Sequence, residues 1–377
     1  MAQLDIPDDR LYGAAARGQV EVLRQQLADR PESASEPGGP MGWVPLLYLC
    51  FSPYLRAGDA AFVEAARLLL EAGASAQAGF FEGAVWESAL YGAAGRAHHV
   101  ELSRLLLKHG ADPNDEETPY HVPESYDLRL LELLVPYVDA ESLTTMLLRK
   151  ADMHDLPGIV YLLEHGADPN RPTRWQHTAF EQALRRDNSL DIVKVMLQHG
   201  AVLSDKGLDL ACRRGRGDVL ELLQLVPDRP DGRCALGLLP GRAPEGLAEL
   251  LAQFAGNGNQ AGVARLLEAG AAVDGLYAGD GYYAIAPAST ALHVACWRGR
   301  PPVVKLLLEH GADVRVRDGH GRSPLQLAVK ACVDSYWTDR RSPDSVAALL
   351  TAGADPNEIA QPCGYDLVDR LLKGQKY

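Results

Sequence analysis

The chain has 377 residues, enough for two or three globular domains of ordinary size. Its composition is 47% hydrophobic and 23% charged, so we expect a large buried core and no wholesale disorder. Acidic residues outnumber basic ones by 50 to 37, and the formal net charge is -13. This balance argues against a nucleic-acid binder and against docking on anionic lipid, because both need a basic face.

Neither the N-terminal residues nor the apolar windows of the chain predict a targeting or membrane segment. The opening residues, MAQLDIPDDR, lack the basic start and apolar stretch of a secretory signal. The most apolar window, 41–55, is interrupted by Pro45 and Pro53 and is too short to span a bilayer as a helix. The six cysteines, at positions 50, 212, 234, 296, 332 and 363, form no CxxC pair. We expect buried free thiols and a cytoplasmic protein.

A Gly-Ala pair closes a Leu-rich run at seven places along the chain. The glycines of these pairs are Gly73, Gly110, Gly166, Gly200, Gly270, Gly311 and Gly353. Four of the intervals between them span 34 to 42 residues, and the other two are long enough to hide a degenerate unit each. Such a period indicates a repeat architecture in place of separate globules.

Taken in chain order, the units differ in how much of the pattern they keep. The first piece, 10–27, has two helical runs, and its LYGAA at 11–15 returns at 90–94. A unit with a shortened first helix is expected from 118, and another unit starts with HTAFEQAL at 177. At 207–225 we expect both helices of a unit but no closing Gly-Ala pair. The next pair of helices is expected to begin at 246 and 261. The last piece, 365–372, predicts a single helix, since terminal units are often atypical.

The clearest unit runs from Thr290 to residue 317 and reads TALHVACWRG followed by RPPVVKLLLEHGADVRVR. The Thr290 hydroxyl can cap a first helix, and Gly299 can end it in a left-handed conformation. Pro301 suits the first turn of the second helix, whose end is marked by Gly311. The following loop contains an Asp-Gly turn signal before the next unit opens at Ser323, 33 residues after Thr290.

This unit resembles the ankyrin repeat, whose pattern is a TPLHxA opening, a Gly between two helices, a VVxLLL second helix and a GADxN close. The resemblance implies an all-α solenoid of paired antiparallel helices with finger loops, of about ten repeats. It also implies that His293, at the TPLH position, bonds to backbone between repeats. We expect an N-terminal repeat block at 1–225, an irregular Pro- and Gly-rich connector at 226–244 and a C-terminal block at 245–377. The whole is expected to be one continuous solenoid, with a hinge or kink at the connector as an alternative.

Residues that could perform chemistry are few. The sequence has no GxSxG, HExxH, P-loop or dinucleotide-binding pattern, so we expect no catalytic residues, no cofactor and no enzyme activity. Four histidines precede the repeat glycine and are expected to cap helix ends: His109, His165, His199 and His310. The adjacent His98 and His99 make a poor chelate and fit a helix start. The DPN segments read as turns without the further acidic residues of a calcium loop, so no metal site is expected.

Insertions into the repeat carry most of the candidate contact residues. One finger insertion holds Phe80, Phe81 and Trp86, and a longer one holds Tyr277, Tyr282 and Tyr283. Between paired helices, PYLRAGD from Pro53 and an insertion with Tyr336 and Trp337 project on the opposite edge. Trp175, in a finger of ordinary length, and Trp297, at a first-helix position that is normally exposed, are expected to be exposed. Aromatic side chains on surface loops are typical of binding hot spots, although inserted loops can also fold their aromatics back over the repeats.

The sequence therefore predicts a non-enzymatic protein-binding module that presents finger loops and a concave face to a macromolecular partner. We expect a monomer whose partner carries a basic patch, because the acidic balance would steer it. Arg-rich, Lys-poor usage looks bacterial, which leaves open an effector, exported without a signal, or an immunity-type inhibitor of a toxin. An enzyme with a site in an inserted loop is a third alternative.

Overall fold

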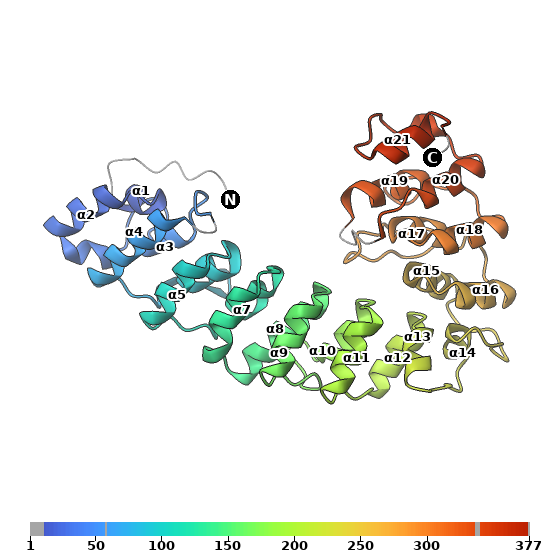
Figure 1. The fold of residues 1–377 in the computed structure, drawn as a ribbon, viewed down its shortest axis with the longest axis horizontal. Coiled ribbons are helices and arrows are strands. Elements are labelled where there is room, and N and C mark those ends of the chain that lie inside the picture. The colour runs from blue at the N-terminus through green and yellow to red at the C-terminus, as the bar shows by residue number, and fades with distance from the viewer. Residues whose placement is uncertain (1–10, 57–58, 336–339, 376–377) are drawn as a thin grey trace. The chain divides into compact units, whose positions relative to one another are not determined.

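The computed structural model describes residues 11–56, 59–335 and 340–375. The chain divides into two compact units, Met1–Val202 and Leu203–Tyr377, and each is described by itself. Both are built mainly from short helices that follow one another in antiparallel pairs (Figure 1).

In the first unit, each repeat contributes two helices, called its first helix and its second helix in chain order. These helices are α1 (Leu11–Ala16) and α2 (Val20–Asp29), α3 (Pro45–Cys50) and α4 (Ala60–Glu71), the π-helix η2 (Tyr91–Arg96) and α5 (Val100–Lys108), α6 (Glu117–His121) and α7 (Leu128–Leu134), α8 (Ala140–Asp152) and α9 (Leu156–Glu164), and α10 (Ala179–Arg185) and α11 (Leu190–Gln198). First helices pack on neighbouring first helices, as α1 does on α3 and α8 on α10, and second helices likewise, as α2 does on α4. The pair α8 and α9 occupies the long interval between Gly110 and Gly166, so this interval does contain a further unit.

The second unit also contains helix pairs, together with two helices, α14 and α21, that have no paired helix next to them in the chain. Its helices are α12 (Asp205–Arg213) and α13 (Gly217–Leu222), α14 (Pro230–Ala235), α15 (Leu247–Asn257) and α16 (Gln260–Glu268), α17 (Ala291–Trp297) and α18 (Pro301–Glu309), α19 (Pro324–Asp334) and α20 (Asp344–Thr351), and α21 (Asp366–Leu372). Helix α15 packs on α17 and α17 on α19, while α16 packs on α18 and α18 on α20. As expected, the last piece is a single helix, α21.

The segment 226–244, which the sequence marks as an irregular connector, contains the helix α14. Its Cys234 and Ala235 are buried in the core of the second unit. The Nδ2 of Asn259 donates to the carbonyl of Ala235 at 2.7 Å and to that of Gly215 at 2.7 Å. This side chain thus joins three consecutive segments of the unit. The irregular assignment of the segment is therefore corrected in part, whereas the boundaries of the predicted blocks stay a prediction.

The repeat glycines end the second helices in the way that the pattern predicts. At all seven Gly-Ala pairs the glycine has a positive φ, from 84° at Gly311 to 101° at Gly73. A β-carbon at these positions would meet no atom within 4 Å, so the need for glycine lies in the backbone and not in crowding. A left-handed residue here turns the chain out of the helix and into the finger.

In several fingers, the side chain four residues after the repeat glycine forms a hydrogen bond to the backbone at the base of the next finger. The Nε2 of Gln77 donates to the carbonyl of Gly110 at 3.0 Å, and the Nδ2 of Asn170 donates to that of Gly200 at 2.8 Å. The side-chain oxygen of Asn170, Oδ1, also accepts from the backbone amide of Val202 at 2.8 Å. In the second unit, the Asp274 carboxylate accepts from the amide of Asp313 at 3.1 Å. These bonds fix the finger bases relative to one another.

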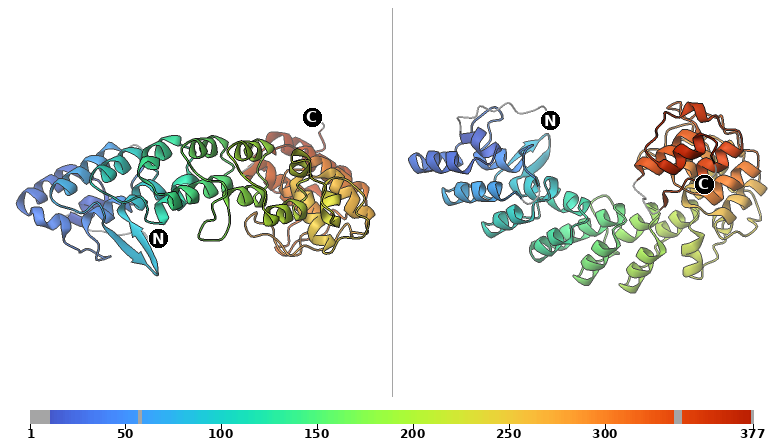
Figure 2. Two further views of the ribbon diagram at one scale, coloured as in Figure 1. Left: turned by 90° about the horizontal axis from the view of Figure 1, so that it is seen from below. Right: turned by 45° about the horizontal axis from the view of Figure 1, so that its top comes forward.

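One finger of the first unit is a β-hairpin, so the all-α expectation needs a small correction. Strands β1 (Gly79–Glu82) and β2 (Val85–Ser88) pair antiparallel, and Figure 2 shows them projecting from the helices of this unit. The amide of Ala89 donates to the carbonyl of Ala78 at 2.8 Å and continues the ladder at its base. Over the described ranges, no helix combines the length and the apolar character that crossing a membrane would require.

Candidate functional site

The β1–β2 hairpin has one face that is open to solvent. Phe81 and Trp86 are directly opposite each other in the register and therefore point to the same face. Their ring centroids lie 4.9 Å apart in an edge-to-face arrangement. Phe81 is 68% exposed and Trp86 is 37% exposed, so this aromatic pair is available for contact.

The opposite face of the hairpin packs on the helices of the preceding repeat. Phe80 stacks on Trp43 with a centroid distance of 4.2 Å and meets Phe51 edge-on at 5.0 Å. Trp43 and Phe51 are themselves buried. Glu87, opposite Phe80, is also buried, and its pKa is raised by burial and by the nearby carboxylates of Glu117 and Glu82. The strand alternation therefore turns one set of aromatics inward and the other outward.

The base of the hairpin is fixed to the next finger through Asp115. Its carboxylate accepts from the Ser88 hydroxyl on β2, and also from the Thr118 amide at 2.7 Å and the Thr118 hydroxyl at 2.9 Å. Burial raises the pKa of Asp115. A two-stranded hairpin is only marginally stable by itself, so these bonds and the Phe80 stack hold it in place.

Arginines of the first unit lie over aromatic rings next to carboxylates. The Arg174 guanidinium is 4.6 Å from the Trp175 ring centroid and pairs with Glu116. The Arg149 guanidinium is 4.1 Å from the Tyr120 ring centroid and pairs with Glu124 at 2.8 Å. Each contact combines a cation–π interaction with an ion pair.

Trp175 is 37% exposed, so the expectation of exposure is confirmed for this residue. Its ring lies 5.4 Å from that of Tyr120, which belongs to α6. Arg174 and Tyr120 were not among the residues singled out by sequence. The adjacency of Arg174 and Trp175 is the one signal that could have suggested their contact.

The long finger of the second unit, 272–289, folds back over first helices. Trp297 on α17 is only 5% exposed, and its Nε1 donates to the carbonyl of Tyr283 at 2.5 Å. Tyr283 and Tyr277 are buried as well, and the Tyr277 hydroxyl accepts from the Nε2 of Gln253 at 2.8 Å. The loop is closed by isolated bridges between Tyr277 and residue 289 and between residues 280 and 285.

A buried arginine lies beneath this finger. The Arg298 guanidinium is 3.7 Å from the Tyr283 ring centroid, and the residue is 2% exposed. Sequence analysis missed Arg298, because nothing in the local pattern indicates that an arginine at the end of a first helix should be covered. Tyr282, adjacent to Tyr283, remains 43% exposed.

The structure corrects the exposure expected for part of the aromatic set. Trp297 was expected at an exposed first-helix position and is buried, because the inserted finger covers it. Tyr277 and Tyr283 follow the alternative, in which an inserted loop turns its aromatics inward. Tyr336 and Trp337 lie outside the described residues. The exposed members of the set are therefore Phe81, Trp86, Trp175 and Tyr282.

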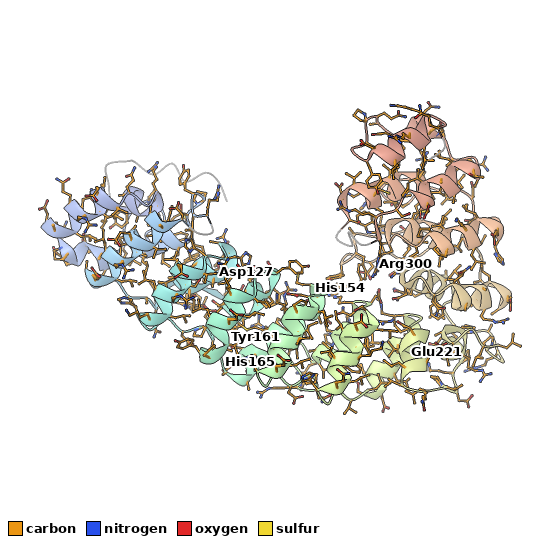
Figure 3. The ribbon with its side chains drawn as sticks, in the orientation of Figure 1. Asp127, His154, Tyr161, His165, Glu221 and Arg300 are labelled. Carbon is orange, nitrogen blue, oxygen red and sulfur yellow. The ribbon has the colours of Figure 1, made fainter. Side chains whose placement is uncertain are left out.

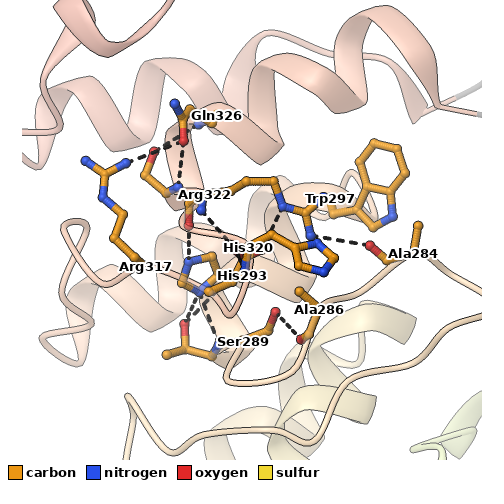
Figure 4. Close-up of polar contacts among 12 residues, drawn as sticks. Ala284, Ala286, Ser289, His293, Trp297, Arg317, His320, Arg322 and Gln326 are labelled. Atoms are coloured by element: carbon orange, nitrogen blue, oxygen red, sulfur yellow. Dashed lines mark hydrogen bonds and ion pairs between the residues drawn. The ribbon is translucent and has the colours of Figure 1, made fainter.

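His293 occupies the position at which the ankyrin pattern places a histidine between repeats. Its Nδ1 accepts from the amide of Thr290 at 3.1 Å, and its Nε2 is 3.1 Å from the carbonyl of Arg322 in the following repeat (Figure 4). These contacts fit a neutral imidazole with its proton on Nε2. Burial lowers the pKa of His293, which agrees with the neutral form.

Several other histidines have structural partners at helix ends, whereas His109, which was expected to cap a helix in the same way, shows no such contact of its side chain with any residue that the structure describes. On α9, the Nδ1 of His165 is 2.7 Å from the Tyr161 carbonyl, and both residues are labelled in Figure 3. His199 and His310 contact the carbonyl four residues earlier in the same way. His99 is the N-cap of α5 and accepts from the Leu102 amide. Within the described part of the chain, no three His, Cys, Asp or Glu side chains are grouped so that they could hold a metal ion.

The cysteines offer no reactive thiol in this geometry. Five of the six are buried and Cys363 is half-buried. Burial raises the pKa of Cys234 to about 11 and that of Cys212 to about 12. Thiols that are shielded and protonated are poor nucleophiles.

Paired helices that pack first on first and second on second, with fingers between the pairs, define a helical repeat protein. Two family models agree on which repeat it is. A model described as "Ankyrin repeats (many copies)" matches residues 266–328, and one described as "Ankyrin repeat" matches residues 87–117. A segment of each unit thus matches an ankyrin repeat model.

Parts of this chain are similar to several curated proteins. Protein phosphatase 1 regulatory subunit 27 of Mus musculus is 37% identical over 94 residues, which cover 22% of this chain and 54% of the relative. Ankyrin repeat and SOCS box protein 16 of Homo sapiens is 32% identical over 181 residues, covering 45% of this chain and 36% of the relative. The ADP-ribosylation factor GTPase-activating protein AGD2 of Arabidopsis thaliana is 34% identical over 82 residues, covering 22% of this chain and 9% of that protein. The chain thus spans about half or less of the length of these relatives.

Proposed function

We propose that this chain is a non-enzymatic protein-interaction module that binds a macromolecular partner through its finger loops and the adjoining concave face. The ankyrin repeats support an interaction role, since repeats of this type imply protein partners. Relatives named as a regulatory subunit and as a SOCS box protein support the same role. Relatives named as enzymes match over a small part of their own length, as AGD2 does over 9%.

The observation that carries the proposal is the open aromatic face of the β1–β2 hairpin. Phe81 and Trp86 are exposed on a strand pair whose other face and base are fixed by Phe80 and Ser88. A rigid scaffold that displays aromatic side chains reduces the entropy lost on binding. Trp175 and Tyr282 supply further exposed aromatics, each within its own unit.

Comparative affinity capture with the full chain tests this function. The variant Phe81→Ala/Trp86→Ala should lose a partner that the unchanged chain captures, while its circular dichroism spectrum stays the same. Tyr54→Ala is the matched control, because Tyr54 is an equally exposed aromatic in the insertion between α3 and α4. A partner set that is identical for all three proteins would overturn the role of the hairpin.

The origin and setting of the protein form a second, finer proposal. Its 29 arginines against 8 lysines support a bacterial source, although the relatives named above are eukaryotic. In that setting the chain would be a monomer that acts in the cytoplasm as a scaffold or as an immunity-type inhibitor. Alternatively, it would be secreted as an effector. Light scattering after size exclusion tests the monomer. A toxin or secretion gene beside the coding locus would favour the effector or immunity role, and an isolated locus would count against it.

A further inference from the structure

Helix α6 forms part of the surface on which the β1–β2 hairpin rests, and its last residue is His121. The helix contacts β2, and the finger base before it bonds to Ser88 through Asp115. We call residues 115–124, which include α6 and the short helix η3 (Val122–Glu124), the hairpin seat. Because a two-stranded hairpin is only marginally stable by itself, a change in the seat alters how firmly the hairpin is held.

Both ring nitrogens of His121 face carboxylates of the seat. Nε2 lies 3.3 Å from a Glu117 oxygen, and Nδ1 lies 3.0 Å from a Glu124 oxygen. A neutral imidazole has one N–H and can donate to only one of the two, whereas the imidazolium donates to both. The geometry is therefore that of a charged histidine that bridges two anions.

The two bridged carboxylates differ in what else holds them. Glu124 also pairs with Arg149 of α8 at 2.8 Å, and Arg149 pairs in turn with Asp152 at 2.6 Å. Among the residues that the structure describes, His121 is the one cation that pairs with Glu117, whose side chain is 15% exposed. Loss of the His121 charge leaves Glu124 with its arginine and Glu117 without a cation.

The hairpin brings a buried carboxylate, Glu87, to the same place. Burial raises the pKa of Glu87, and the nearby charges of Glu117 and Glu82 raise it further. The charge of Arg96, at the end of η2, acts in the opposite direction. Glu87 lies on β2 and Glu117 on α6, so repulsion between them acts across the contact that seats the hairpin. This repulsion falls when Glu87 takes up a proton or when His121 is charged.

The other groups that face His121 do not change their charge near neutral pH. The Tyr91 ring of η2 lies 5.2 Å from the His121 ring, and burial raises the pKa of Tyr91 to about 12. Burial lowers the pKa of His98, which follows η2, so this histidine is neutral at neutral pH. On α8, Arg149 and Lys150 are each held by an aspartate. Since histidine is the side chain whose ordinary charge change falls between about pH 5 and 8, the state of the seat in this range depends on His121.

We propose that the hairpin seat is a proton-dependent latch, in which charged His121 bridges Glu117 and Glu124 and thereby holds the β1–β2 hairpin. The seated hairpin favours the protonated forms of His121 and Glu87. The hairpin is therefore held firmly in mild acid and loosens as the pH rises above neutrality. The latch sets how firmly the hairpin is held, whichever partner the chain binds, and so goes beyond the binding role proposed above.

Amide exchange of the hairpin in the full chain tests the latch. Protection factors compare each measured rate with that of an unfolded reference at the same pH, and so remove the intrinsic effect of pH on exchange. Amides of β1 and β2 should be about fivefold more protected at about pH 6 than at about pH 8, while those of α4 and α5 keep the same protection. Equal protection of the hairpin at the two pH values, or an equal change in α4 and α5, would overturn the proposal.

Two variants should remove the pH dependence from opposite sides. In His121→Gln the bridge is absent at both pH values, so the hairpin should have the lower protection throughout. In Glu117→Gln the repulsion across the contact between β2 and α6 is gone, so protection should stay high at about pH 8.

Glu116→Gln is the matched control for Glu117→Gln. It removes the same charge one residue away, from a carboxylate that pairs with Arg174. This control should keep the difference of about fivefold between the two pH values. The same difference in Glu117→Gln would overturn the proposal.

A measurement on the unchanged chain is independent of how well the variants fold. Nuclear magnetic resonance of isotope-labelled histidine reports the protonation of each ring nitrogen, and the His121→Gln variant assigns the signals of His121. Both nitrogens should carry a proton at about pH 6 and only one at about pH 8. A neutral His121 ring at about pH 6 beside a hairpin that is still protected would overturn the bridge.

Discussion

Two insertions occupy the same place in the repeat, between a repeat glycine and the next first helix, and they have opposite fates. The finger at 79–88 forms a paired hairpin that turns one aromatic face outward. The finger at 272–289 has only isolated bridges and covers Trp297 with the backbone of Tyr283. The difference teaches that a paired hairpin keeps one aromatic face open to solvent, whereas a finger closed only by isolated bridges lies over the helices.

The largest effect is expected from removing the side chain that the second finger covers. Trp297→Ala should lower the free energy of unfolding of the second unit by about 3 kcal/mol, because a large buried side chain leaves a cavity. Urea unfolding followed by circular dichroism measures this change. Trp86→Ala, which removes the same side chain from the exposed hairpin, should stay within about 0.5 kcal/mol. Equal losses would break the contrast between the two fingers.

A smaller loss is expected when the cover over Arg298 is weakened. Tyr283→Leu keeps apolar bulk but removes the ring that lies 3.7 Å from the Arg298 guanidinium. For a desolvated cation–π contact we expect a loss of about 2 kcal/mol in the same urea measurement. Tyr283→Phe retains the ring and should keep most of the stability. A leucine variant as stable as the phenylalanine variant would show that the finger is held by bulk alone.

The second unit should lose stability in mild acid through His293. Burial lowers its pKa in the folded state, so below the unfolded value of about 6.5 the unfolded chain binds more protons than the folded one. Stability is therefore present above pH 6.5 and falls by up to about 1 kcal/mol between pH 6.5 and 5.5. Thermal unfolding at several pH values measures this slope, which His293→Gln should flatten. An unchanged slope in that variant would assign the pH dependence to other groups.

The smallest effect should be confined to the hairpin. Ser88→Ala removes the hydroxyl that donates to Asp115, and one such bond contributes about 1 kcal/mol. Amides of β1 and β2 should exchange with deuterium about fivefold faster, while those of α4 and α5 are unchanged. Faster exchange throughout the first unit would show that the hairpin is part of the repeat core and not a separately anchored element.

The repeat could be predicted from sequence because its signals are local. The Thr290 cap, the left-handed Gly299 and the paired prolines at 301–302 each act within a few residues, and α17 and α18 begin and end where they predict. Helix α14 was missed because it has six residues and begins at Pro230, so it shows no helical period. Helices this short are held by neighbours such as Asn259 and not by their own sequence.

The fate of the fingers could be predicted only in part. Both insertions are rich in aromatics, and composition alone does not say which side chains turn inward. Phe80 and Phe81 are adjacent and chemically identical, yet strand alternation packs the half-buried Phe80 against Trp43 and exposes Phe81. The burial of Trp297 depends on the Tyr283 carbonyl, which is 14 residues away and is placed by the loop closure. Such a contact has no local pattern.

The bonds from Gln77, Asn170 and Asp274 to the following finger have a consequence for protein engineering. They lie at the base of each finger, before any insertion begins, and they fix the base whatever the length of the tip. A finger can thus be treated as a replaceable cassette. Residues 79–87 could be exchanged for a designed loop while Gln77 and Ser88 keep the graft in register, which makes this chain a scaffold for displaying foreign hairpins.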